Sequence, residues 1–385
     1  MRKSILILLL AFCIHVNAEN NGPILWNMDK LQSIVTDKSQ SAFISSVISS
    51  ADRYSRTQPL TVVNKTKCIS GNPHNFESLS IYFWPDPANP NGPYIVRDGY
   101  FNPEYKDYDL PKLIEFTNRI KTLALAYFFS NNPKYAARCL EELRVWFINE
   151  NTYMTPTFEY AQVAPGHWNG KGAAVGLVDA YYFVDIIESL RLLQQRGMVS
   201  DADNLSFKTW FNSFLDWSVN SDNGRTISAM PDNVSTAYDV LIYSIASYVD
   251  KKAIQKEVIK RFNTNHITDK IDSKGRQIEE LKRPTAMTYS IINLNHLLDF
   301  YIMLKNTGKK ISKKNLKIIS KAANYLEGFV DNKDKFEYKE LNDWNTLEKR
   351  LVLQTSKMKR LDSKIQLGSQ SKAKQVPFDV TNVTE

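Results

Sequence analysis

Cysteine and glycine are scarce in this chain of 385 residues, which contains 3 Cys and 14 Gly. These counts exclude a collagen-like chain and a small disulfide scaffold. The hydrophobic fraction of 43% and the aromatic fraction of 12% exclude intrinsic disorder, because such a chain can bury a core. After residue 18, no stretch approaches the roughly 18 apolar residues of a membrane span. We therefore expect one large globular domain or two of ordinary size.

Sequence motifs for several common chemistries are also missing. The glycine-rich loop that binds phosphate, the nucleophile elbow and the zinc-protease helix are all absent, which disfavours nucleotide, hydride-transfer and protease functions. The histidines after residue 18 lack the spacing of metal ligands, so no metal site is predicted. They are His74, His167, His266 and His296.

The first eighteen residues have the pattern of a secretory signal peptide. Two cations, Arg2 and Lys3, precede a short apolar run over residues 5–14. Small residues for cleavage follow in Val16-Asn17-Ala18. The sequence therefore predicts a secreted or periplasmic protein whose mature chain begins after Ala18.

The charge of the chain favours anionic partners. The formal charge is +8, and removal of the two cations in the signal peptide leaves +6. Nucleic acid, acidic polysaccharide and anionic lipid all fit this charge, but an exported protein rarely meets nucleic acid. Export also permits disulfides, so Cys68 and Cys139 either form one or remain two buried thiols.

Helical periodicity extends over most of the chain after Pro111. Apolar residues recur three and four positions apart from Leu113 to Tyr127, and a second helix is expected to end near Phe147. Short connections between successive helices favour antiparallel hairpins, which stack into bundles, solenoids or toroids. Further helices are predicted over residues 29–54, 173–196, 202–219, 234–249, 251–263, 285–305, 311–329 and 339–361.

Residues 68–109 differ in kind, because their prolines and glycines forbid long helices while aromatic residues abound. Flat rings such as Tyr82 and Trp84 suit stacking on sugar faces, and Arg97 is available for a carboxylate. A second interpretation has equal weight. In it, the segment is a proline-rich loop that is held in place because its aromatic residues pack against the core.

Three more segments combine polar side chains with turns. Residues 159–172 offer Gln162, His167 and Lys171 beside glycines, although a simple connector between helices fits as well. Residues 231–239 begin a helix that Asn233 or Ser235 could cap. In residues 277–290, Arg283 and Tyr289 flank a turn into a helix, where such a pair is more often structural than catalytic.

In this order, these segments resemble the alginate lyase superfamily of polysaccharide lyases over roughly residues 70–300. The resemblance implies an all-α fold, an incomplete (α/α) toroid or barrel of antiparallel helical hairpins, over residues 19–362. Residues 363–385 then form a polar, loose tail. The similar segments are Tyr82–Pro87, Arg97–Gly99, Asn102–Glu104, Leu143–Phe147 and Tyr160–Gln162.

The resemblance also implies an activity, the cleavage of alginate or glucuronan type polysaccharides by β-elimination. Such a reaction needs a group that stabilises the uronate carboxylate, a base for the C5 proton and an acid for the leaving oxygen. The family's motifs fall on Asn233 for the carboxylate and on Arg283 and Tyr289, and no cofactor is implied. The implied substrate-binding residues are His74, Tyr82, Trp84, Arg97, Gln162, His167, Lys171 and Tyr238.

One departure from the family pattern affects the chemistry, because Val234 stands where the family has its active-site histidine. Valine cannot transfer a proton. Either Tyr289 acts alone as base and acid, with Arg283 lowering its pKa, or the protein binds acidic polysaccharide without cleaving it. A purely structural helical repeat is disfavoured, since it would not need the aromatic residues of 76–108.

Overall fold

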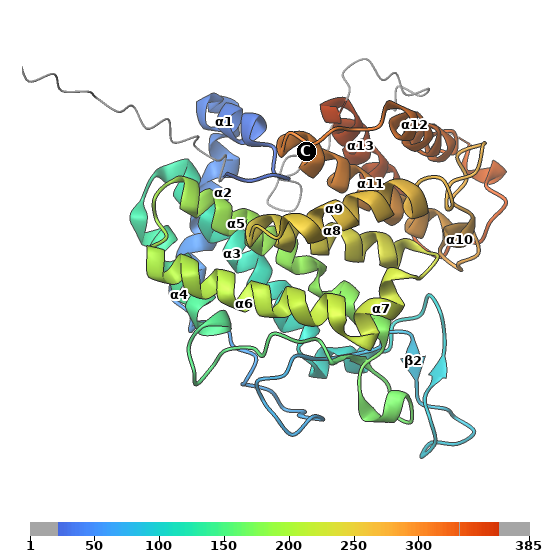
Figure 1. Ribbon diagram of the computed structural model, residues 1–385, viewed down its shortest axis with the longest axis horizontal. Helices are drawn as coiled ribbons and strands as arrows, with labels where there is room; N and C mark the ends of the chain where they lie inside the picture. The colour runs from blue at the N-terminus through green and yellow to red at the C-terminus, as the bar shows by residue number, and fades with distance from the viewer. Residues whose placement is uncertain (1–21, 331, 362–385) are drawn as a thin grey trace, which may run out of the picture.

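Paired helices make up most of the computed structural model, which describes residues 22–330 and 332–361 (Figure 1). The signal peptide predicted over residues 1–18 and the tail predicted over 363–385 lie outside the described residues. The helices are α1 Met28–Thr36, α2 Ser41–Tyr54, α3 Leu110–Ser130, α4 Pro133–Phe147, α5 Phe183–Gln195, α6 Asp201–Asn220, α7 Asp222–Ser228, α8 Asn233–Tyr248, α9 Lys252–Arg261, α10 Ile278–Leu281, α11 Ala286–Asn306, α12 Lys313–Glu327 and α13 Trp344–Leu361.

The helices pack in an inner and an outer layer. Helices α3, α5, α8 and α11 contact one another in that order, and α4, α6, α9 and α12 each pack outside one or more of them. This arrangement confirms the predicted all-α toroid of helical hairpins. Within the described residues, no helix is long and apolar enough to cross a membrane.

The hairpins are short because local signals end one helix and start the next. Asn131 ends α3 in the left-handed region at φ 52°, a conformation that asparagine adopts more readily than most residues. Asn132 then caps α4 by accepting a hydrogen bond from the backbone of Lys134, and Pro133 takes the first helical position. Two residues therefore suffice to reverse the chain.

The inner helices are buried on nearly every face. Along α8, even Ser235, Thr236 and Asp239 are fully buried. Along α11, buried positions include Asn293 and Asp299 among the apolar residues. Because burial of an unpaired polar group is costly, these side chains require hydrogen-bond partners inside the protein.

Some predicted helix boundaries are wrong. The helix predicted over 29–54 is two helices, because Asp37 accepts a hydrogen bond from the backbone of Ser39 and starts a 3₁₀ turn between them. In the segment predicted as 173–196, residues Ala174–Tyr182 form a 3₁₀ helix before α5. Helix α13 begins at Trp344 and not at 339.

The aromatic segment contains no long helix, as predicted, and forms short strands. Strand β1, Glu77–Leu79, pairs in parallel with β4, Tyr160–Val163, and β2, Phe83–Trp84, pairs antiparallel with β3, Ile95–Val96. In Figure 1, β2 lies at the lower edge of the molecule, opposite α1, α12 and α13. The β1–β4 pairing brings the two loop segments with predicted binding residues side by side.

The N-terminal segment is held by a buried carboxylate. Glu188, on α5, is fully buried and accepts hydrogen bonds from the backbone N–H groups of Ile24, Leu25 and Trp26 at 3.1, 2.6 and 2.9 Å. Arg360, on α13, donates to the carbonyl oxygen of Leu25 at 3.1 Å. Both ends of the described chain are therefore fixed at the same side of the toroid.

The two cysteines of the described residues do not form a disulfide. Cys68 is exposed, whereas Cys139 is buried on α4. Of the two states that the sequence left open, the structure has two thiols, but the expectation that both are buried is wrong for Cys68.

We expect Glu188→Ala to destabilise the protein by about 3 kcal/mol or more, because three buried backbone donors lose their acceptor. The free energy of unfolding, measured by urea titration, checks this. Glu150→Ala is the matched control, since Glu150 is exposed and its loss should change stability by less than about 0.5 kcal/mol. Equal stability of the two variants would contradict the role of Glu188.

Candidate active site

Two tyrosines meet at the start of α11. The hydroxyl of Tyr289, in the first turn of α11, lies 2.6 Å from the hydroxyl of Tyr82, which precedes β2. Both side chains are half-buried. The contact joins the aromatic segment to the inner helical layer, so two residues 207 positions apart share one site.

An arginine covers the face of Tyr289. The guanidinium carbon of Arg283 lies 3.9 Å from the centre of the Tyr289 ring, a cation–π contact. The Nε and Nη2 atoms of Arg283 each donate to a carboxylate oxygen of Asp98 at 2.8 Å. Such a two-pronged ion pair fixes the plane of the guanidinium, and here it orients the group over the phenol.

The pKa of Tyr289 is raised above its ordinary value of 10, because burial outweighs the opposing effects of the Tyr82 hydrogen bond and of Arg283. Arg283 does lower the pKa of Tyr289, as expected. The expectation of a pKa below the ordinary value is wrong, because burial raises it by more. Burial raises the pKa of Tyr82 as well, and the neighbouring Tyr289 adds to that increase. Both groups are phenols near neutral pH.

The ring of Trp84, two residues after Tyr82, has one face covered. The guanidinium of Arg97 stacks 5.4 Å from the centre of the indole, whose Nε1–H donates to the carbonyl oxygen of Tyr100 at 2.9 Å. The paired strands β2 and β3 hold this arrangement. A flat ring and a cation thus lie together on the loop, with Arg97 stacked on the ring that the sequence analysis assigned to sugar stacking.

Asn233 begins α8 and is bound to a carboxylate that the sequence did not identify as a site residue. Its Nδ2 atom donates to Oε2 of Glu280 at 2.8 Å, and both residues are buried. Burial raises the pKa of Glu280 to about 7, while Asn233 opposes the increase and Asp232 adds to it. Val234, the next residue along α8, packs against the core.

The second loop segment, residues 159–172, lines part of a cavity of about 650 Å³. Phe83, Trp168 and Lys171 line it together with Trp217. Trp168 has a left-handed backbone at φ 48° and is 39% exposed, so its ring faces solvent at the cavity wall. Lys171 forms an ion pair with Glu159 at 2.7 Å.

His167 and Gln162, from the same segment, bind other protein groups. The Nε2 atom of His167 lies 2.7 Å from the carbonyl oxygen of Tyr94, and its ring contacts Phe83 edge-on. Gln162 donates its amide to the buried carboxylate of Asp179 at 2.9 Å. These contacts fix the loop against the aromatic segment.

Two predicted binding residues lie apart from the tyrosine pair. His74 bonds the carbonyl oxygen of Tyr153 at 2.6 Å and packs against the Tyr153 ring. Tyr238 is 2% exposed, and its hydroxyl donates to the carbonyl oxygen of Ser218 at 2.9 Å. The structure thus gives Tyr238 a core contact instead of a solvent-facing one.

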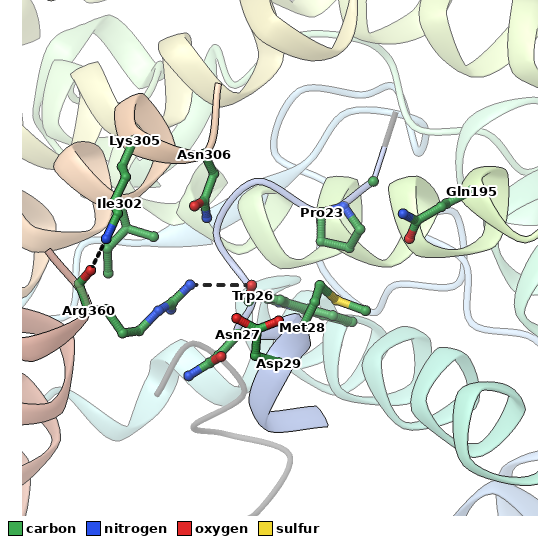
Figure 2. A pocket seen from close by; sticks show the side chains of 11 residues that line it. Pro23, Trp26, Asn27, Met28, Asp29, Gln195, Ile302, Lys305, Asn306 and Arg360 are labelled. Atoms are coloured by element: carbon green, nitrogen blue, oxygen red, sulfur yellow. Dashed lines mark hydrogen bonds between the residues drawn. The ribbon is translucent and has the colours of Figure 1, made fainter. Parts of the chain in front are cut away.

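Another cavity, of about 470 Å³, lies between the N-terminal segment, α11 and α13 (Figure 2). Arg360 and Lys305 approach one another there, and Asn306 and Gln195 come from the ends of α11 and α5. None of the predicted site residues lines it. Within the described residues, no three His, Cys, Asp or Glu side chains gather in a way that could hold a metal ion.

Comparisons with known proteins agree with this fold. The family model described as alginate lyase matches residues 61–336. An alginate lyase from Bacteroides ovatus has a similar structure, with a TM-score of 0.84, 27% identity, and coverage of 89% of this chain and 93% of that chain. Alginate lyase A1-III from Sphingomonas species A1 shares the fold, with a TM-score of 0.51, 13% identity, and coverage of 84% and 89%. No curated protein sequence matches the chain.

The toroid, its loop-covered end and these structural neighbours place the protein among the polysaccharide lyases. Since the family model matches well over half of its residues, the chain belongs to the alginate lyase family.

Sequence reasoning missed Asp98 and Glu280 as members of the site. Each holds one of the family-derived residues in place, Asp98 through Arg283 and Glu280 through Asn233. Asp98 is 185 positions from Arg283, so no local pattern links them. Glu280 lies on the short helix α10, and its partner Asn233 is 47 positions away, so no local pattern links this pair either.

We predict that Glu280→Gln raises stability at neutral pH. The folded-state pKa of about 7 exceeds the ordinary 4.5, so the folded parent binds more protons between these values and loses stability as pH rises through them. The glutamine amide cannot ionise, and its carbonyl oxygen still accepts from Asn233. The stability gain over the parent should grow from about zero below pH 4.5 to at most about 3 kcal/mol above pH 7.

Unfolding titrations at a series of pH values check this prediction. Glu279→Gln is the matched control, because Glu279 is partly exposed and pairs with Lys282 at the surface. A difference between Glu280→Gln and the parent that does not change with pH would contradict the assignment.

Proposed function

We propose that the protein cleaves uronate-containing polysaccharide, of the alginate or glucuronan type, by β-elimination. The observation that carries this proposal is the guanidinium of Arg283 stacked on the phenol of Tyr289, next to a second phenol. A cation beside a buried phenol favours the charged states of proton abstraction from a uronate. Family membership supports an acidic polysaccharide as the substrate.

Asn233 is proposed to bind the uronate carboxylate. A carboxamide has two N–H donors, and Glu280 accepts from this amide nitrogen. A second donor is thus left for a substrate oxygen. Because Glu280 fixes the amide, its orientation is set before substrate arrives. A hydrogen bond to the carboxylate stabilises the enediolate that develops when the C5 proton is lost.

Tyr289 is proposed to remove the C5 proton, with Arg283 stabilising its phenolate. Both proton transfers then occur on the side of the sugar ring that faces α11. That geometry is syn elimination, which mannuronate and glucuronate permit and which guluronate, epimeric at C5, does not. The aromatic segment with Trp84 and Arg97 is proposed to hold neighbouring sugar units by stacking and charge.

Secretion or export to the periplasm is proposed from the signal peptide pattern of residues 1–18. A large acidic polysaccharide lies outside the cytoplasm of most cells, so this location suits the proposed substrate. Acidic polysaccharide or its oligosaccharides are the proposed partners, as the mature charge of +6 favours.

A second candidate function is binding of acidic polysaccharide without cleavage. Val234 favours it, because the side chain at the histidine position can neither donate nor accept a proton. The loop groups Trp84, Arg97 and Lys171 would remain useful to such a protein. The formation of unsaturated product separates the two functions.

We predict that Tyr289→Phe abolishes cleavage, with a loss of at least about 100-fold in kcat, while uronate oligomers bind nearly as before. Absorbance of the unsaturated product and calorimetric binding measure the two effects. In the parent, activity should rise with pH on the alkaline side. The reason is that the base is a phenolate and the pKa of Tyr289 lies above 10.

A matched control is Tyr153→Phe, because Tyr153 is also a tyrosine near the loops and packs on His74 away from Arg283. Its kcat should stay close to that of the parent. Full activity in Tyr289→Phe, or efficient cleavage of guluronate blocks by the parent, would rule out the proposed mechanism.

We further predict that Val234→His changes the reaction in one of two distinct ways. If the parent is active, the imidazole adds a second proton carrier beside Asn233 and extends cleavage toward guluronate. If the parent only binds, the same change creates activity. Product absorbance on mannuronate, guluronate and glucuronate polymers distinguishes these results, and Val234→Leu controls for the volume added. A Val234→His variant with the same activity and substrate range as the parent would contradict the placement of residue 234 at the site.

A further inference from the structure

The site contains two phenols in contact where the family-derived pattern supplies one. We propose that Tyr82 is a second catalytic residue, which donates the proton to the C4 oxygen that leaves during elimination. The proposal rests on the proposed function and deepens it, because it divides the two proton transfers between Tyr289 and Tyr82. In the sequence-based hypothesis, Tyr289 performs both transfers and Tyr82 only stacks on sugar.

The distance between the two hydroxyls fits this division. In syn elimination, the C5 proton and the C4 oxygen lie on adjacent carbons and on the same side of the ring. Their separation is about one hydrogen-bond length. The hydroxyl oxygens of Tyr82 and Tyr289 are 2.6 Å apart, so one group can face each reacting position at the same time.

The surroundings of the pair decide which phenol is the base. Arg283 stacks on the ring of Tyr289, and its positive charge favours the phenolate there. A hydrogen bond from Tyr82 to the oxygen of Tyr289 favours the same phenolate. Asp98 accepts two hydrogen bonds from the guanidinium of Arg283 and so neutralises part of its charge.

Tyr82 is the phenol of the pair that holds its proton more firmly in the resting site. Burial, the largest cause, raises the pKa of both tyrosines, and Arg283 lowers both. The contact between the two hydroxyls has opposite effects, because it raises the pKa of Tyr82 and lowers that of Tyr289. Tyr82 therefore keeps its proton when Tyr289 loses one. An acid that remains protonated while the base is charged is what the second half of the elimination requires.

Backbone contacts hold Tyr82 in place. Its carbonyl oxygen accepts from the N–H of Arg97 at 2.7 Å, next to the β2–β3 pair, and its ring packs against Phe101. The preceding Ile81 accepts from the backbone of Asn102 at 2.7 Å. The hydroxyl thus extends from an ordered turn toward Tyr289, as a positioned acid must.

The proposed reaction is balanced without any further reactant. The Tyr289 phenolate takes the C5 proton, the C5–H electron pair forms the C4=C5 double bond, and the C4–O bond breaks. Tyr82 gives its proton to the departing oxygen and becomes a phenolate. Transfer of the proton from Tyr289 to Tyr82, across their 2.6 Å contact, restores the starting state.

The experiment compares Tyr82→Phe with the parent on two substrates. The first is a uronate oligomer, whose leaving oxygen needs a proton. The second is a uronide with fluorine at C4, which leaves as fluoride and needs none. We expect kcat for the oligomer to fall at least about 100-fold with KM changed less than about twofold, while fluoride release stays within about fivefold of the parent.

The matched control is Tyr100→Phe, an exposed tyrosine of the same loop, which should behave like the parent on both substrates. Fluoride release by Tyr82→Phe also shows that the variant is folded.

Three results would overturn the proposal. An equal loss on both substrates would assign Tyr82 to binding or positioning, and a parent-like rate on the oligomer would remove it from the reaction. Both leave the proposed function intact. A parent protein that cleaves neither substrate would contradict the proposed function. The proposed role of Tyr82 would then be wrong too, because it depends on that function.

Discussion

Burial of the inner helices on nearly every face is the constraint on which the rest of the structure depends. A polar side chain on such a helix cannot reach water, so it must find a partner inside the protein. Asp239 of α8 is bonded by Arg261 and His266, and Asp299 of α11 by Tyr181 and Lys357. These bonds join the inner layer to the outer helices and to α13. The layers of the toroid are therefore held together by buried polar contacts as well as by apolar packing.

The same constraint explains where reactive groups can lie. At the loop end of the toroid, the first turn of α11 contacts the aromatic segment through Tyr82, and the first turn of α8 contacts the short helix α10 through Glu280. Tyr289 and Asn233 are both in first turns, of α11 and α8. There the partner of a polar group can be a loop residue such as Tyr82, and a substrate can take its place.

Sequence patterns predict the helical architecture and the contact between Arg283 and Tyr289, because both depend on residues close together in the chain. The helix predicted over 202–219 agrees with α6 to within a residue at each end, since Ser200 is a recognisable cap. The break at residues 37–40 is missed, because a single aspartate turn decides it. Partners such as Asp98 depend on how distant segments meet, which no local pattern encodes.

The contacts that α13 makes with the N-terminal segment and with α11 have a consequence for the order in which the fold forms. Two side chains of α13 make these contacts. Arg360 donates to the carbonyl oxygen of Leu25, and Lys357 donates to the carboxylate of Asp299. The ribosome synthesises the N-terminal residues first. Leu25 and Asp299 therefore lack these hydrogen-bond partners until residue 360 has been synthesised. Closure of the ring is therefore a late step, and a chain halted before α13 would expose the inner face of α11 to chaperones and proteases.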